Sequence, residues 1–229
     1  MRNGLDHMIL RARESALSIM PIWRVVKWLG LILLAGFVVS TAWRAVHAAF
    51  DNDQFPEALL VKVELLPAIF PLHMVAGGLA LILVPLTLVL RGTAFHKWAG
   101  RLTAAVVIVA ALTAIPVALT APVTSMAAAG FSTQGLVWLA LIAKGVWHIR
   151  SGDVNAHRHA MLLMAAVTSG AMFFRIYLAL WAVFGTASGF KTFYACDAWM
   201  AWAVPLAVTW AVLTRPFPFA KREYAVPMK

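Results

Sequence analysis

Six apolar stretches, each long enough to cross a lipid bilayer, account for most of this chain of 229 residues. A membrane-spanning helix needs about 17–25 apolar residues, because the hydrocarbon core is roughly 30 Å thick and a helix rises about 1.5 Å per residue. The stretches cover residues 25–43, 66–90, 102–119, 126–149, 160–185 and 196–214. The sequence therefore predicts an all-α fold, a polytopic membrane bundle of six transmembrane helices.

The composition excludes the soluble classes of protein. Hydrophobic residues make up 62% of the chain and charged residues 12%, with a mean hydropathy of +0.84. An ordinary soluble domain has roughly 25% charged residues. A soluble enzyme and a disordered chain are therefore excluded. The single cysteine, Cys196, also excludes an intrachain disulfide and any metal site built from several cysteines.

Three parts are expected along the chain. Residues 1–24 form a cytoplasmic amphipathic N-terminal segment, residues 25–214 the transmembrane domain, and residues 215–229 a cytoplasmic tail. The first apolar stretch is too long for the core of a signal peptide, so it is expected to be a retained span. The largest polar segment, residues 44–64, has room for a short surface helix.

Basic residues fall in alternate connections between the spans, and this asymmetry predicts the orientation. They lie before or at the start of the first span, after the second, after the fourth and after the sixth: Arg2, Arg11, Arg13, Arg24, Lys27, Arg91, Lys97, Arg101, Arg150, Arg158, Arg215, Lys221, Arg222 and Lys229. The other connections and the outer span ends contain only Arg44, Lys62 and Lys191 together with Asp51, Asp53, Glu57, Glu64 and Asp197. The positive-inside rule places both termini in the cytoplasm. We expect a multi-pass membrane protein, whose net charge of +10 serves orientation rather than nucleic-acid binding.

Arg175 is the basic residue that lies deepest in a predicted span. Burying an arginine in hydrocarbon costs at least about 2.5–3.5 kcal/mol, so something must compensate for it. One interpretation is snorkelling of the side chain to the outer interface. The other is an anion held inside the bundle, such as a propionate, a substrate carboxylate or a quinone oxygen.

His73 lies at a similar predicted depth, about seven residues into the second span from the outside. Gly77 follows one helical turn later and therefore lies on the same face. A glycine beside a histidine leaves a flat slot in which a macrocycle could lie, but it also permits close packing of two helices. Both interpretations stay open at this stage.

His96 and His157 open the third and fifth spans, at the cytoplasmic end of the predicted bundle. If they face each other, they have the residue type needed for axial ligands of a haem iron. If they do not, they are interfacial histidines. His73 lies roughly 25 Å of helix away from this end, so no single metal ion could join the two positions. The arrangement predicts either two separate sites or none.

Several runs resemble a bacterial family of multi-pass membrane proteins catalogued as domain of unknown function twenty-three-oh-six. They are HMVAGGLALILVPL, HKWAGRL and GDVNAHRHAMLLMAAVTSGAMFFRIYLAL, and the likeness covers about residues 65–210. The resemblance implies a protein of the bacterial cytoplasmic (inner) membrane, and the family pattern has histidine at the positions of His73, His96 and His157 and arginine at that of Arg175. We take these four residues as the candidate cofactor-binding positions. A fainter similarity links the chain to the histidine-ligated bundles of cytochrome b and ferric reductases, but it supplies no reaction.

The sequence leaves three functions open. The first is a redox membrane protein that binds haem b or a quinone and takes part in electron transport, with His96 and His157 on the iron and His73 and Arg175 at a second site. The second is a small transporter that uses His73 and Arg175. The third is a non-catalytic membrane subunit or assembly factor. No HExxH, CxxC or glycine-rich phosphate loop is present, and enzyme activity stays undecided.

The orientation can be tested with reporter fusions. A reporter that is active only in the periplasm should give no signal when fused after Lys229, because the basic connections hold that end in the cytoplasm. A fusion within residues 186–190 should give a strong signal. Strong periplasmic activity after Lys229 would refute the predicted topology.

Overall fold

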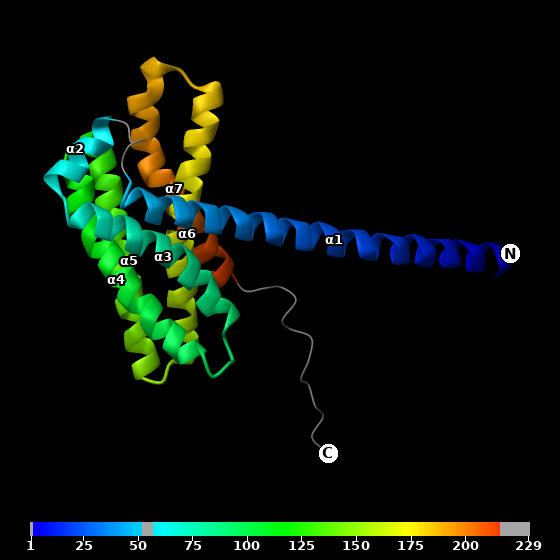
Figure 1. Cartoon of the computed structure of the whole chain (residues 1–229). Helices are drawn as coiled ribbons and strands as arrows, with labels where there is room; N and C mark the ends of the chain where they lie inside the picture. Colours follow the sequence, from blue (N-terminus) through cyan, green and yellow to red (C-terminus); the bar gives the residue numbers. More distant parts are fainter. Residues whose placement is uncertain (1, 52–56, 216–229) are drawn as a thin grey trace. The chain divides into compact units, whose positions relative to one another are not determined.

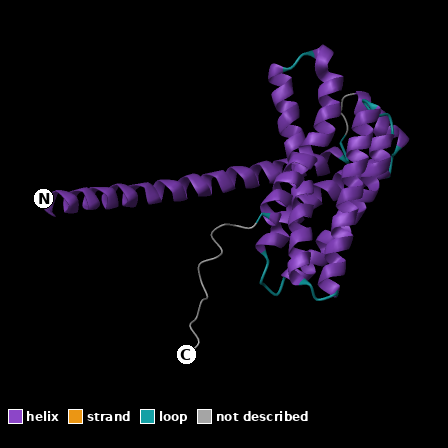
Figure 2. Cartoon of the chain, turned by 180° about the vertical axis from the view of Figure 1, so that it is seen from behind, coloured by secondary structure: helices purple, strands orange, loops and turns teal. Residues whose placement is uncertain are grey.

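The computed structural model describes the backbone of residues 2–51 and 57–215 and the side chains of residues 22–51 and 59–215. These parts contain helices and no strand (Figures 1 and 2). The elements are α1 (Arg2–Ala48), α2 (Glu57–Leu65), α3 (Ile69–Val89), α4 (His96–Leu119), α5 (Ser125–Arg150), α6 (Val154–Phe184), η1 (Ala187–Gly189) and α7 (Phe190–Thr214). The predicted tail lies almost wholly outside the described residues, as do the side chains of most of the predicted N-terminal segment.

The prediction of an all-α membrane bundle is confirmed. Six helical segments are long and apolar enough to cross a bilayer: Ile22–Ala48, Ile69–Val89, His96–Leu119, Ser125–Arg150, Val154–Phe184 and Ala187–Thr214. The short helix α2 lies within the polar segment where a surface helix was expected. The chain divides into two compact units, residues 1–41 and 42–229. The first is the greater part of α1, and the second contains the bundle.

Several helix boundaries differ from the predicted span boundaries. The side chain of Asp153 accepts a hydrogen bond from the amide of Ala156 (2.9 Å), which starts α6 six residues early, at Val154. Pro71, expected inside its span, lies instead in the first turn of α3, where proline is tolerated. The helix α7 begins at Phe190 rather than at residue 196. Asp197, expected at the outer end of the last span, therefore lies about two turns inside α7.

Consecutive helices from α3 to α7 pack as neighbours, and α5 also contacts α7. Their core is built from small and branched side chains: Ala76, Ala80, Val84, Val107, Ala110, Ala111, Trp138, Ile142, Met164 and Val167. Small residues let helix backbones approach closely in a membrane. A Cβ at Gly130 would come within 2.8 Å of the carbonyl oxygen of Ala198, so the contact between α5 and α7 requires glycine there.

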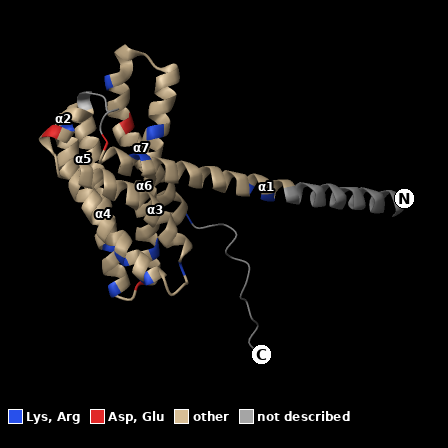
Figure 3. Ribbon diagram, viewed as in Figure 1, with Lys and Arg blue, Asp and Glu red and all other residues tan. Residues whose placement is uncertain are grey.

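The two ends of the bundle differ in charge (Figure 3). We call the end that carries the α3–α4 and α5–α6 connections the basic end, because Arg91, Lys97, Arg101, Arg150 and Arg158 lie there. The other end, which carries the connection between α6 and α7, is called the hairpin end. Helices α6 and α7 project there beyond α3, α4 and α5 (Figure 1).

Three histidines join neighbouring helices through their Nδ1 atoms. His73 on α3 bonds the carbonyl of Ala110 on α4 (3.1 Å), and His96 on α4 bonds the carbonyl of Thr87 on α3 (3.1 Å). These two bonds hold the α3–α4 pair near both of its ends. His157 on α6 bonds the carbonyl of Gly145 on α5 (2.8 Å). A carbonyl oxygen only accepts, so each Nδ1 carries the proton and donates it.

His96 also satisfies a helix terminus. Thr87 lies in the last turn of α3, where backbone carbonyls have no partner further along the helix. The imidazole of His96, the first residue of α4, supplies a donor to that carbonyl. A carbonyl left unpaired at the end of a membrane helix would cost free energy, so His96 stabilises the turn between the two helices.

The histidine bonds predict a loss of stability on substitution. His96→Ala and His157→Ala should each lower the free energy of unfolding by about 0.5–1.5 kcal/mol, the net value of one hydrogen bond. Thermal unfolding in detergent would measure this loss. His159→Ala is the matched control, since His159 is exposed and should leave stability unchanged. Equal effects at all three positions would contradict a role for the bonds.

Candidate functional site

A cavity of about 340 Å³ lies within the bundle toward the hairpin end. We call it the main cavity. Helices α3 to α7 line it, together with two residues of α2 and Ala45 near the end of α1. Most of the lining is apolar, and the exceptions are Lys62, His73, Gln134, Thr168, Arg175 and Tyr194. The described lining contains two cations and no carboxylate.

His73 presents one free ring nitrogen at the main cavity. Its Nδ1 lies 3.1 Å from the carbonyl oxygen of Ala110 and 3.3 Å from the hydroxyl oxygen of Thr113. Because Nδ1 donates to the carbonyl, the neutral ring has an unprotonated Nε2 whose lone pair can accept a hydrogen bond or bind a metal. The tertiary structure thus fixes both the orientation of His73 and its tautomer.

Gly77 and Gly78 have different roles. A Cβ at Gly78 would lie 2.9 Å from the carbonyl oxygen of Ala42, so this glycine permits close packing of α3 on the end of α1. A Cβ at Gly77 would meet nothing within 4 Å, and Gly77 lines the main cavity. Helix packing therefore accounts for Gly78, whereas Gly77 leaves open space beside His73.

Arg175 points along its own helix into the same cavity. Its Nη1 donates to the carbonyl oxygen of Ala171 (2.7 Å), one turn nearer the basic end. Among the described residues no carboxylate pairs with the guanidinium, which has five N–H donors in all. The structure thus brings His73 and Arg175 to one cavity, and Arg175 retains donors for an oxygen-bearing ligand.

Lys62 is a cation that the sequence reasoning placed in a connection. Its Nζ donates to the carbonyl oxygen of Val117 (2.9 Å) and to that of Thr120, at the C-terminal end of α4. A cation is favourable there because the helix dipole is negative at its C-terminus. Partial burial lowers the pKa of the Lys62 ammonium group. The sequence feature that could have indicated this residue is the position of a lysine inside the apolar run LLVKV of α2.

Three aromatic rings pack together at the cavity wall. Phe131 and Phe174 meet edge to face at 5.2 Å, Phe174 and Tyr194 at 5.4 Å, and Phe131 and Tyr194 at 6.0 Å between ring centres. They come from α5, α6 and α7, so the cluster joins three helices. All three line the main cavity. Sequence reasoning missed their convergence because the rings come from different helices.

Trp138 and Thr168 form a buried, hydrogen-bonded pair between α5 and α6. The indole Nε1 of Trp138 donates to the hydroxyl oxygen of Thr168 (3.0 Å), which in turn donates to the carbonyl of Met164 (2.9 Å). The amide of Gln134 donates to the carbonyl of Val167 (3.3 Å). These bonds tie α5 to α6, and the carbonyl oxygen of Gln134 remains available to a ligand donor.

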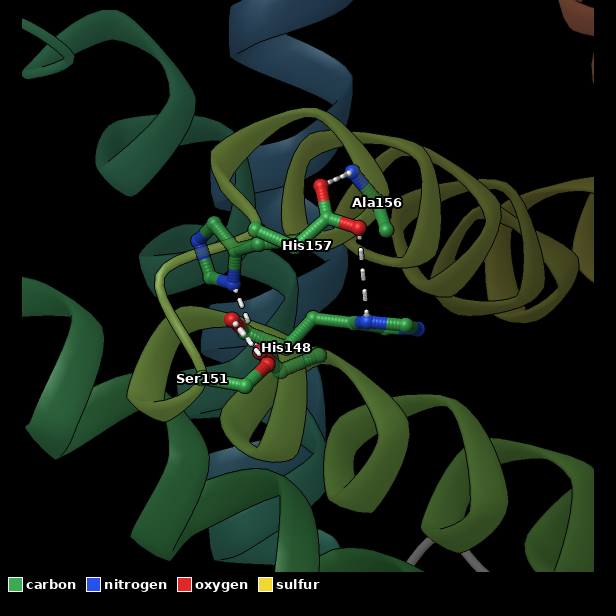
Figure 4. Close-up of polar contacts among 6 residues, drawn as sticks. His148, Ser151, Ala156 and His157 are labelled. Carbon is green, nitrogen blue, oxygen red and sulfur yellow. Dashed lines mark hydrogen bonds and ion pairs between the residues drawn. The ribbon is translucent and has the colours of Figure 1, made fainter.

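His96 and His157 lie at the basic end, and neither lines the main cavity. Figure 4 shows the surroundings of His157, whose Nδ1 points to the backbone of α5. In the same region His148 lies 4.0 Å from the Asp153 carboxylate. Both His96 and His157 are half-buried and leave Nε2 free of a protein bond. The idea that they share an iron stays a prediction.

The packing limits how His96 and His157 can meet. Helix α4 packs mainly on α3 and α5, and α6 packs mainly on α5 and α7. A ligand shared by the two histidines would therefore have to lie across α5 or beside α3. Within the described residues, no three His, Cys, Asp or Glu side chains gather in a group that could hold a metal ion.

Comparison with known proteins identifies a family. Residues 70–213 match the family described as "Predicted membrane protein (DUF2306)". The match includes His73, His96, His157 and Arg175 but not Lys62. No curated protein and no solved structure matches the chain. Since the match covers more than half of the sequence, this six-helix membrane protein belongs to the DUF2306 family.

Proposed function

We propose that the main cavity binds the head group of a membrane-dissolved quinone or quinol. The observation that carries this proposal is the opposite hydrogen-bonding character of two residues in one apolar cavity. His73 offers the lone pair of Nε2, and Arg175 offers N–H donors. A quinol hydroxyl donates to the first, and a quinone carbonyl or quinolate oxygen accepts from the second.

The cavity volume supports a single-ring head group over a four-ring macrocycle. Small-molecule sites range from about 300 to 1,000 Å³, so a volume of about 340 Å³ is at the low end. Gly77 provides the flat space beside His73 that a planar ring needs. The walls contributed by Phe131, Phe174 and Tyr194 suit an aromatic or quinoid ring.

A plain carboxylate ligand, such as a fatty acid, accounts for fewer of the contacts. Arg175 and Lys62 would attract its charge, but an ionised carboxylate has no proton to donate to Nε2 of His73. The buried nitrogen would then lack a partner. A quinol satisfies both residues, and His73 can hold the proton that the quinol gives up.

Quinone binding can be measured with a short-chain ubiquinone analogue and detergent-purified protein. Arg175→Gln should weaken binding roughly 10- to 100-fold, because it removes a charged hydrogen-bond donor worth about 1.5–3 kcal/mol. Arg101→Gln is the matched control, since Arg101 lies at the basic end and its guanidinium contacts Trp98. Undiminished binding by Arg175→Gln would contradict the site.

His73→Asn separates the two functions of the histidine. The asparagine amide can still donate to Ala110, but it has no counterpart of Nε2, so binding of the reduced quinol, whose hydroxyl donates to Nε2, should fall while thermal stability is retained. Gly77→Ala should also weaken binding without unfolding, since its added methyl group enters open space. Wild-type protein that binds neither quinone nor quinol would refute the proposal.

Haem b at the basic end is the second candidate. It is favoured by one observation: His96 and His157 each donate Nδ1–H to a backbone carbonyl, the arrangement that orients metal-bound histidines and leaves Nε2 to the iron. Iron bound there would supply one-electron chemistry, and these two histidines would hold it.

The absorbance of the purified protein tests this second candidate. Protein expressed with a haem supply should show a Soret band that His96→Ala and His157→Ala each remove. His159→Ala should retain it, because His159 is exposed. A wild-type protein without a Soret band, or a band that persists in His96→Ala, would exclude these ligands.

Transport through the main cavity stays an alternative use of the same residues. Asp197 lies inside α7 and is an acidic residue within a membrane-length helix, a feature common in transporters. Transport would be favoured over redox chemistry if vesicles that contain the protein took up an organic anion with no quinone ring. Arg175→Gln should then abolish this uptake.

A further inference from the structure

Asp197 is the single acidic residue within the six membrane-length helices that the structure describes. It lies seven residues after the first residue of α7, roughly 10 Å along the helix. The residue is 2% exposed. Within the described part of the chain, neither carboxylate oxygen has a hydrogen-bond partner.

The surrounding charged groups do not compensate for an ionised carboxylate. The titratable residues of α5 are Lys144, His148 and Arg150, all near the basic end. The short helix η1 has none. On α6 the nearby groups are Arg175 and Tyr177, and Arg175 lines the main cavity without pairing with Asp197.

The remaining titratable groups lie on α7 itself, and they are Lys191, Tyr194 and Cys196. None of them is hydrogen-bonded to the carboxylate. A buried ion without a partner costs many kcal/mol, and such a group in a membrane protein usually takes up a proton instead. The packing therefore favours the neutral acid.

A second cavity, of about 400 Å³, lies beside this residue, and its lining extends to Phe184 and Gly185 at the hairpin end. We call it the hairpin cavity. It lies between α6 and α7 and is lined by Tyr177, Leu180, Trp181, Phe184, Gly185, Phe193, Cys196, Asp197 and Met200. Trp181 and Phe193, both in its lining, stack on each other with ring centres 4.3 Å apart. Asp197 is the one acidic group of an otherwise mainly apolar lining.

We propose that Asp197 is a proton-binding site of this membrane protein, loaded and unloaded through the hairpin cavity. One proton from water at the hairpin end adds to one carboxylate oxygen, and the neutral carboxyl group releases the same proton in the reverse step. No electron moves. The site stands on the burial and isolation of Asp197 and does not depend on the ligand of the main cavity.

A protonated carboxyl group that opens onto an apolar cavity should react with a hydrophobic carbodiimide. The carboxyl O–H adds across one N=C bond to give an O-acylisourea, which rearranges to a stable N-acylurea, and no atom is lost. Full-length protein in detergent would be treated with dicyclohexylcarbodiimide at neutral pH and mapped by peptide mass spectrometry. We expect one adduct on Asp197, and labelling should decline as the pH is raised.

Matched variants separate this reaction from general labelling. Asp197→Asn should lose the adduct, whereas Asp153→Asn should keep it, because Asp153 is an exposed carboxylate that caps α6. Wild-type protein that gives no adduct at Asp197, or labels Asp153 equally, overturns the proposal. This result can be read even if a variant fails to fold.

Infrared spectroscopy gives a second measurement. At neutral pH the wild type should show the carbonyl stretch of a protonated carboxyl group, which Asp197→Asn removes. Asparagine has the shape of the neutral acid, so the variant should unfold at nearly the wild-type temperature. Absence of the band from the wild type would show an ionised Asp197 and contradict the proposal.

Discussion

Polar groups that cannot reach water must find partners inside the bundle, and this constraint governs the rest of the structure. Neighbouring helices meet it with histidine side chains: His73, His96 and His157 each donate to a backbone carbonyl of the adjacent helix. Lys62 does the same for the last carbonyls of α4. Each bond fixes the orientation of a side chain by engaging one of its polar groups. The other polar atoms of that side chain stay available to a ligand. The interactions that hold helices together therefore also orient the groups available to a ligand.

Helix number and the convergence of His73 with Arg175 were predictable, because apolar length sets the spans and counting residues from a helix end sets depth. The depth of Asp197 was not, because apolar length placed the start of that span at residue 196, next to Asp197, whereas α7 begins at Phe190. The aromatic cluster of Phe131, Phe174 and Tyr194 joins three helices, and residue spacing within one helix carries no information about such contacts. Lys62 was missed because its acceptors belong to α4, far along the chain.

The two cavities differ in the ionisable residues of their described linings. The main cavity contains Lys62 and Arg175 without a carboxylate, whereas the hairpin cavity contains Asp197 without a cation. Stability alone does not account for Arg175 or Asp197, since a buried ionisable group without a partner of opposite charge costs free energy. The separation suits two different ligands: an oxygen-bearing head group at the first cavity and a proton at the second.

The register of α6 against α7 bears on why Arg175 and Asp197 do not form an ion pair. Gly170 packs on Trp202, and Trp181 stacks on Phe193, so the antiparallel helices place Arg175 and Asp197 at the same level. Opposite charges at one level of a membrane helix pair would ordinarily form an ion pair. Here Arg175 turns to the carbonyl of Ala171 and Asp197 remains without a hydrogen bond. A neutral Asp197 explains this arrangement, because a protonated carboxyl group attracts the guanidinium weakly and leaves it to the ligand of the main cavity.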